Sequence, residues 1–243
     1  MTYCLGIKTR TGLVLASDSR TNAGLDQVNT CRKMHTLVKD GERVFILLTS
    51  GGLSLGQSVM TIVGEQFTAG KGLAEVNTFY EAARCVGEAV RHVESLDRAA
   101  LERDKIPFNL HVILGGQVRG SPPDLYMIYP QGNPLHVTED APFLQLGEIK
   151  YGRPILDRGV RYEETTLEEA AKYALLSLDS TMRSNMTVGP PIDLLVYRDG
   201  DLAIRQHCRF PAEDPQLADI RSHWEHELRR AIQALPPIRF GST

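Results

Sequence analysis

The sequence lacks most of the features that mark nucleic-acid-binding or membrane proteins. Its 27 Lys and Arg residues are outnumbered by 30 Asp and Glu, so the formal net charge is −3 and no basic field exists for nucleic acid. No segment reaches the roughly 20 apolar residues that a membrane-spanning helix needs. The N-terminus lacks a charged segment followed by an apolar one. We therefore expect a cytoplasmic protein that binds neither nucleic acid nor membrane.

Cysteine and histidine are too few and too scattered to predict a disulfide framework or a metal site. The chain has 4 Cys, none in Cys-x-x-Cys spacing, which favours reduced thiols over disulfides or a structural zinc site. His223 and His226 share a helix face but lack an obvious third ligand, so solvated positions are the favoured interpretation. The glycine pairs lack the lysine and hydroxyl of a phosphate-binding loop. We expect no metal and no cofactor.

The most informative residue is Thr2, directly behind Met1. If Met1 is removed, the threonine carries its own general base, because the freed α-amino group has an ordinary pKa of about 7.7 to 8.0 and lies within reach of the hydroxyl. Many ordinary proteins also begin Met-Thr, so this signal needs support from other residues.

Two charged residues give that support. The pattern predicts a strand over residues 3–8, a turn at 11–12 and a returning strand over 13–16, which brings Asp18 near Thr2. Lys33 follows a polar loop at the start of another apolar stretch. Its charge would favour the neutral amine and the deprotonated hydroxyl, and Asp18 would orient it. The plain alternative is that Asp18 caps a turn and Lys33 is solvated.

The segment Gly12–Gly24 (GLVLASDSRTNAG) resembles the signature of catalytic proteasome β subunits and of bacterial HslV-type peptidases. The opening Met-Thr-Tyr-Cys, the run from Arg32 to His35 and the long tail most resemble the bacterial proteasome-related group called Anbu. The resemblance implies an α+β fold of the N-terminal nucleophile hydrolase type, a four-layer αββα sandwich. It also implies Thr2 as nucleophile with Asp18 and Lys33 beside it.

A strand predicted over residues 43–48 leads through Thr49-Ser50-Gly51-Gly52 into a helix expected over 53–67. Glycines at a strand-to-helix turn let backbone N–H groups approach a ligand. In the resembling peptidases the glycine at this point donates to the developing oxyanion, and that role falls to Gly51 here. The alternative is a flexible loop, since Gly-Gly is common.

Further site residues follow from the resemblance alone. A helix that starts near Leu167 contains Asp179, followed five residues later by Ser184 and then Asn185. In proteasome subunits an aspartate and a serine from this helix support the threonine amine, although both residues could simply end the helix here. The backbone near Thr21 and Asn22 resembles the edge that binds an extended peptide as an added strand.

Two departures from the family pattern stand out. Lys33 lies one residue nearer to Asp18 than is usual in proteasome subunits. Where related peptidases carry a Gly-Ser-Gly turn whose serine approaches the threonine amine, this chain has Glu148 between Gly147 and Ile149. A carboxylate facing the amine would favour its protonated form and oppose Lys33. We expect Glu148, in a glycine-bounded loop, to face solvent.

The remaining elements complete two predicted domains, residues 2–210 as a proteasome-type peptidase domain and 211–243 as a helical C-terminal extension. Helical periodicity predicts a long helix over 74–103. Strands are expected at 110–117 and 125–129, and a final hairpin pairs 193–198 with 202–208. After a Pro-Ala-Glu-Asp-Pro linker, a helix is predicted over 216–235, packed on a neighbour or on the domain's own edge.

The function predicted from these residues is a threonine-type endopeptidase that cleaves peptides or unfolded proteins with Thr2 after Met1 is removed. The resemblance implies a ring-like homo-oligomer that encloses its active sites, and it allows an ATP-dependent unfolding partner, although no residue identifies one. One alternative is an amidase with the same nucleophile and a small amide substrate. Another is a non-catalytic ring scaffold in which Met1 stays attached.

Overall fold

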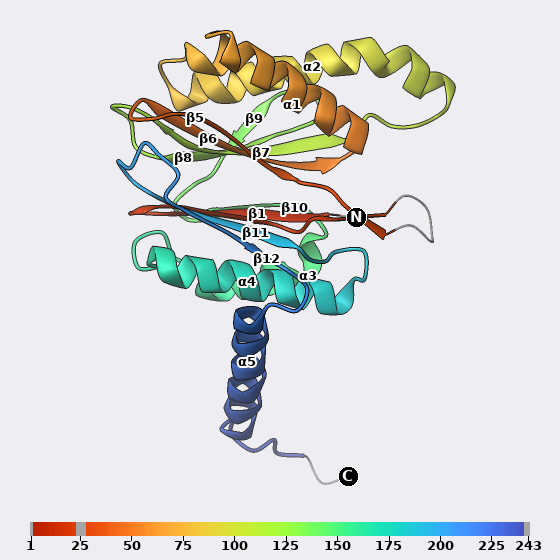
Figure 1. The fold of residues 1–243 in the computed structure, drawn as a ribbon. Helices are drawn as coiled ribbons and strands as arrows, with labels where there is room; N and C mark the ends of the chain where they lie inside the picture. The colour runs from red at the N-terminus through yellow and green to blue at the C-terminus, as the bar shows by residue number, and fades with distance from the viewer. Residues whose placement is uncertain (1, 23–27, 241–243) are drawn as a thin grey trace.

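Two antiparallel sheets stack face to face, and helices cover the outer face of each (Figure 1). The computed structural model describes residues 2–22 and 28–240. Its strands are β1 (Tyr3–Thr9), β2 (Gly12–Ser17), β3 (Arg20–Asn22), β4 (Val28–Thr30), β5 (Met34–Lys39), β6 (Arg43–Gly51), β7 (Leu110–Val118), β8 (Asp124–Ile128), β9 (Pro134–His136), β10 (Phe143–Gly147), β11 (Ile192–Arg198) and β12 (Gln206–Phe210). Its α-helices are α1 (Leu53–Thr68), α2 (Phe79–Arg103), α3 (Ile149–Gly159), α4 (Leu167–Ser184) and α5 (Pro215–Gln233). The predicted four-layer αββα sandwich is confirmed.

The order of the strands makes β1 an inner strand of its sheet. One sheet runs β10-β1-β2-β11-β12 and the other β5-β6-β7-β8-β9, while β3 and β4 form a separate hairpin. Cys4 in β1 pairs with Ser17 on one side and with Leu146 on the other. The start of β1 lies at the end of the sandwich from which the β3–β4 hairpin projects (Figure 1).

Apolar side chains fill all three gaps between the four layers. In β1, Tyr3, Leu5 and Ile7 pack toward the layer of α3 and α4, whereas Cys4 packs between the two sheets. This alternation is what a strand buried on both faces requires. Full burial of a leucine or isoleucine side chain contributes roughly 1.5 to 3 kcal/mol, so these strands are fixed strongly in place.

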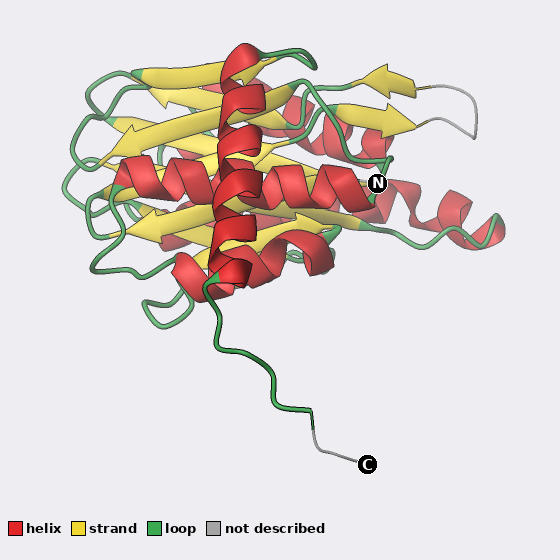
Figure 2. Ribbon diagram, turned by 90° about the horizontal axis from the view of Figure 1, so that it is seen from below, coloured by secondary structure: helices red, strands yellow, loops and turns green. Residues whose placement is uncertain are grey.

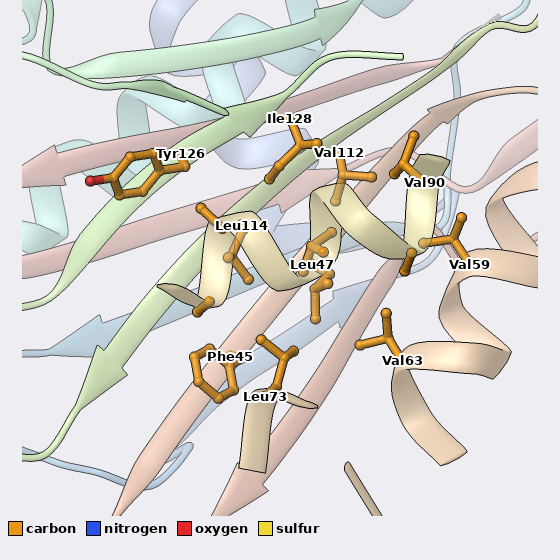
Figure 3. Close-up of a cluster of buried hydrophobic side chains, with 14 of the residues drawn as sticks. Phe45, Leu47, Val59, Val63, Leu73, Val90, Val112, Leu114, Tyr126 and Ile128 are labelled. Carbon is orange, nitrogen blue, oxygen red and sulfur yellow. The ribbon is translucent and has the colours of Figure 1, made fainter. Parts of the chain in front are cut away.

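The third gap lies between the outer helices α1 and α2 and the sheet of β5 to β9. Figure 3 shows Phe45 and Leu47 from β6 facing Val59 and Val63 from α1 and Val90 from α2. These five side chains are between 0% and 1% exposed. Packing on this side holds the end of β6 and the start of α1 in a fixed relation.

Local hydrogen bonds set several boundaries that periodicity misplaced. Helix α2 begins at Phe79, not at residue 74, because the Thr78 hydroxyl caps it by accepting from the Glu81 N–H. Strand β12 begins at Gln206, not at residue 202. Leu202 has a φ of 43° and its N–H donates to the Tyr197 hydroxyl, so the chain is looped there.

Strand β10 and helix α3 were not predicted, because the glycines around Glu148 suggested a loop. Gly152 has a packing reason. A Cβ on it would lie 2.4 Å from the Tyr3 hydroxyl oxygen and 2.3 Å from Oγ of Ser177. The glycine therefore lets α3 approach β1 and α4 closely.

Helix α5 lies outside the sandwich and crosses α4 (Figure 2). It begins at Pro215, where the Asp214 side chain caps the N–H groups of Gln216 and Leu217. None of its residues is buried in this chain. Among the residues that the structure describes, no helix is both long and apolar enough to cross a membrane.

Candidate active site

Thr2 lies at the start of β1, and β2 returns the chain to it. Cys4 faces Ser17 in this register, so Tyr3 and Asp18 are the next pair. The Tyr3 N–H donates to Oδ1 of Asp18 at 2.9 Å, and the Asp18 N–H donates to the Tyr3 carbonyl oxygen at 3.1 Å. The hairpin expected from the sequence therefore puts Asp18 beside the residue that follows Thr2.

Lys33 enters the site just before β5. Its Nζ donates to Oδ1 of Asp18 and to the Arg20 carbonyl oxygen, each at 2.7 Å. Only 8% of the Lys33 side chain and none of the Asp18 side chain is exposed. The lysine ammonium is thus held in one direction by two buried acceptors.

The Asp18 carboxylate is buried but fully bonded. Its second oxygen, Oδ2, accepts from the Gly189 N–H at 3.2 Å. Burial raises the pKa of the Asp18 carboxyl, and the Lys33 charge opposes that rise, as do the two backbone N–H donors. Asp18 consequently joins three parts of the fold: β1, the Lys33 segment and the loop before β11.

Thr2, Lys33 and Gly51 open onto one pocket with a volume of about 230 Å³. Its walls come from β3, the segment around Lys33, the end of β6 and the first turns of α1. The lining residues are Thr2, Arg20, Thr21, Cys31, Arg32, Lys33, His35, Thr49, Ser50, Gly51, Gly52, Leu53, Gly56, Gln57 and Leu110. Three residues that the sequence predicted separately are therefore gathered at one cavity.

Gly51 occupies a backbone conformation that side chains disfavour. Its φ is 124°, and a Cβ on it would lie 2.0 Å from the carbonyl oxygen of Asn109. The next residue, Gly52, donates its N–H to that same carbonyl at 2.8 Å and then begins α1. The turn is therefore fixed by β7 and is not a flexible loop, and only glycine fits at position 51.

Glu148 lies on the other side of Thr2 and is buried, so the expectation that it faces solvent is wrong. Its N–H donates to the Thr2 carbonyl oxygen at 2.9 Å, and the residue is 9% exposed. Asn185 donates its Nδ2 to Oε2 of Glu148 at 2.9 Å, and Lys150 Nζ lies 3.4 Å from Oε1. These two partners offset the cost of burying the carboxylate.

Asn185 also orders the loop that carries Gly189. Its Oδ1 accepts from the N–H of Thr187 at 3.0 Å and from the Thr187 hydroxyl at 2.5 Å. The position of this asparagine directly behind Ser184 was one hint of its importance, but it did not indicate its partners. Glu148 and Asp18 are thus linked through a single loop between α4 and β11.

Comparison with known proteins agrees with this fold and geometry. A family model described as "Proteasome subunit" matches residues 2–196. The chain belongs to the proteasome subunit family. A helical assembly of the Anbu complex from Pseudomonas aeruginosa contains a chain that is 42% identical, with a TM-score of 0.92 over 98% of each chain. Anbu, the ancestral β subunit, from Yersinia bercovieri is 38% identical, with a TM-score of 0.92 over 99% of this chain and 100% of that one. Within the proteasome family the chain is therefore an Anbu protein.

A more distant relative is the proteasome subunit beta of Haloquadratum walsbyi. It is 27% identical over 210 residues, which cover 86% of this chain and 78% of the relative. The predicted resemblance to proteasome β subunits and to Anbu is therefore confirmed.

Two predicted site residues are not brought to the pocket of this Anbu chain. Oδ1 of Asp179 accepts from Nε of Arg221 in α5 at 2.5 Å, and Oδ2 lies 3.6 Å from Nε of Arg183. Ser184 is exposed at the end of α4. Neither residue lines the cavity that contains Thr2. The geometry gives Asp179 a role in attaching α5.

Thr21 lines the pocket and lies in β3, where it pairs with Asn29 of β4. Asn22 is the next residue of β3 and pairs with Val28. Thr21 of this hairpin therefore borders the cavity, and the pairing of β3 with an extended peptide stays a prediction.

Proposed function

We propose that the chain is a threonine-type peptidase whose nucleophile is the Thr2 hydroxyl after Met1 is removed. The observation that carries this proposal is the single pocket lined by Thr2, Lys33 and Gly51, with Lys33 fixed by the buried Asp18 carboxylate. Such a nucleophile needs no histidine, because its own α-amine is the general base.

The reaction begins when Oγ of Thr2 bonds to the carbonyl carbon of a peptide bond and its proton passes to the α-amine. The C–N bond of the substrate then breaks, and the amine returns that proton to the leaving nitrogen. Water attacks the resulting ester, again with the amine as base, and restores the Thr2 hydroxyl. The Lys33 ammonium favours the neutral amine and the developing alkoxide throughout.

The carbonyl oxygen becomes negative in the tetrahedral intermediate, and the Gly51 N–H is the proposed donor to it. The fixed turn at Gly51 supports this role, because a preorganised donor needs no rearrangement. Loss of one such donor typically costs about 3 to 4 kcal/mol of transition-state stabilisation. Thr21 and Asn22 in β3 would pair with the substrate backbone as an added strand.

We further propose that the chain works as a homo-oligomer. The helical assembly of the Pseudomonas aeruginosa Anbu complex supports this, since that chain is similar over 98% of its length. Helix α5, with no residue buried in the single chain, offers a surface for such contacts. Access to the enclosed sites would then select peptides and unfolded chains as substrates.

Intact-mass analysis of the protein purified from its own cells tests the nucleophile, with and without an epoxyketone that bonds to both the amine and the hydroxyl of an N-terminal threonine. We expect loss of Met1 and one adduct, which peptide mapping places on Thr2. The Thr2→Ala variant is the matched control and should gain no adduct. Retained Met1 without an adduct would support the scaffold alternative. An adduct together with cleavage of small amides but of no peptide would support the amidase alternative.

A further inference from the structure

The pocket beside Thr2 carries an uneven distribution of charge. Its lining includes Arg20, Arg32 and Lys33, and no lining residue that the structure describes is acidic. Asp18 balances the Lys33 charge, and the Arg20 guanidinium donates to the Met186 carbonyl oxygen at 2.6 Å.

Arg32 is the cation left to meet a substrate. It is exposed, and within residues 2–22 and 28–240 it forms no ion pair with a carboxylate. Arg32 and His35 both line the cavity, where burial and then the Arg32 charge hold the pKa of His35 below its ordinary value. His35 is consequently a neutral wall residue that adds hydrogen-bonding capacity, and Arg32 supplies positive potential.

The start of α1 adds positive potential from the opposite wall. Leu53, Gly56 and Gln57 of its first two turns line the cavity. Gly52 caps this helix without a side-chain hydrogen bond, and the first turn contains no acidic residue. The N-terminal turn of this 16-residue helix therefore lines the pocket, and the positive end of the helix has no negative partner from the helix itself.

The other walls favour a polar occupant over a large apolar one. Thr49, Ser50 and Gln57 contribute hydroxyl and amide groups, while Leu53 and Leu110 are the aliphatic members of the lining. A volume of about 230 Å³ suits a single side chain next to the reacting carbonyl. A basic side chain in this place would face Arg32 and Lys33 and would be disfavoured by like charge.

We propose that this pocket selects peptides with glutamate or aspartate immediately before the cleaved bond, with Arg32 and the N-terminus of α1 binding the carboxylate. This inference rests on the proposed peptidase function and adds its substrate class. Arg32 acts as a specificity residue, whereas the Lys33–Asp18 pair supports the reaction of Thr2.

The test compares peptides that are identical except for Glu, Gln, Leu or Lys before a fluorogenic leaving group. Glu and Gln have nearly the same shape, so their ratio of kcat/KM isolates the charge. We expect the Glu peptide to be cleaved about tenfold more efficiently, as one ion pair and one helix terminus would provide. The preference should shrink as salt rises, because both contributions are screened.

Variants then assign the preference to Arg32. Arg32→Gln should bring the Glu-to-Gln ratio close to one, and Arg32→Glu should favour the Lys peptide. Arg119→Gln removes one exposed positive charge outside the pocket and is the matched control, which should keep the full ratio. A ratio near one in the parent protein, or a ratio unchanged in Arg32→Gln, would overturn the proposal.

A second measurement separates this proposal from the peptidase assignment. Fluorescence anisotropy measures binding of peptides that end in Glu or Gln to the Thr2→Ala variant, which cannot react. Tighter binding of the Glu peptide supports a pocket that selects acidic side chains, even if the parent protein turns over nothing. Equal binding overturns it, while epoxyketone labelling of Thr2 still reports on the nucleophile alone.

Discussion

The ammonium nitrogen of Lys33 lies 2.7 Å from Oδ1 of Asp18, and both side chains are buried. Removing one partner would leave the other as an uncompensated buried charge. We expect Asp18→Asn and Lys33→Met each to lower the free energy of unfolding by about 3 to 5 kcal/mol, measured by urea denaturation. Turnover should be lost in both.

The double variant Asp18→Asn/Lys33→Met shows whether this loss comes from the pair. It should recover much of the stability, because no charge is then left alone, yet it should stay inactive. If the two single effects simply add in the double variant, the two charges are not coupled, and an unpaired buried charge is not the cause of the lost stability.

Glu148 provides the second prediction, because its N–H bonds to the Thr2 carbonyl oxygen and its carboxylate is buried. A negative charge near the Thr2 amine stabilises the ammonium form, which cannot act as base. Glu148→Gln should therefore move the acidic limb of the kcat/KM profile to lower pH, by about one unit.

Lys150→Gln is the matched control. It removes a positive charge from the same carboxylate and should move that limb in the opposite direction. If the pH profile of kcat/KM is unchanged in both variants, the Glu148 carboxylate does not affect the pKa of the Thr2 amine.

Sequence reasoning placed residues correctly where their positions depended on local geometry. A hairpin with a two-residue turn fixes which residues face one another, so the distance along the chain sufficed to bring Asp18 beside Thr2. The strand-to-helix turn at Gly51 was equally local. The four-layer fold followed from the family resemblance, since periodicity alone gives only mixed helices and strands.

Sequence reasoning was insufficient where a side chain contacts a partner that lies far away in the sequence. Glu148 is buried because the Asn185 amide donates to its carboxylate and its own N–H donates to the Thr2 carbonyl oxygen, and nothing in the 147–152 segment indicates those partners. Asp179 matches a family pattern and its role beside the amine stays a prediction, but the partner that the structure shows, Arg221, lies 42 residues further on, in a helix outside the sandwich. A pattern of spacings cannot show which of two possible partners a carboxylate takes.

The third prediction separates the two roles of Asp179. If its carboxylate attaches α5 through Arg221, Asp179→Asn should destabilise that attachment by about 1.5 to 3 kcal/mol, the range for hydrogen bonds to charged groups. Hydrogen exchange would then be faster across α5 and unchanged in β1. Arg221→Gln should reproduce the effect. Loss of turnover in Asp179→Asn with α5 still protected, and no such loss in Arg221→Gln, would instead support the amine-binding role implied by the family.

The last prediction concerns pH and stability. Burial, with the Arg32 charge added, lowers the pKa of His35 from its ordinary value of 6.5. Between that lowered pKa and about pH 6.5 the unfolded chain binds more protons than the folded chain, so the free energy of unfolding falls as the pH decreases. The contribution is fully present above about pH 6.5. His35→Gln should therefore flatten the decline of stability below this pH, measured by urea denaturation from pH 8 to pH 5.

Burial also lowers the pKa of His111, so His111→Gln should flatten the curve independently and the double variant should be flatter than either. A His35→Gln curve that parallels the parent protein would mean that His35 takes up its proton equally well in the folded pocket.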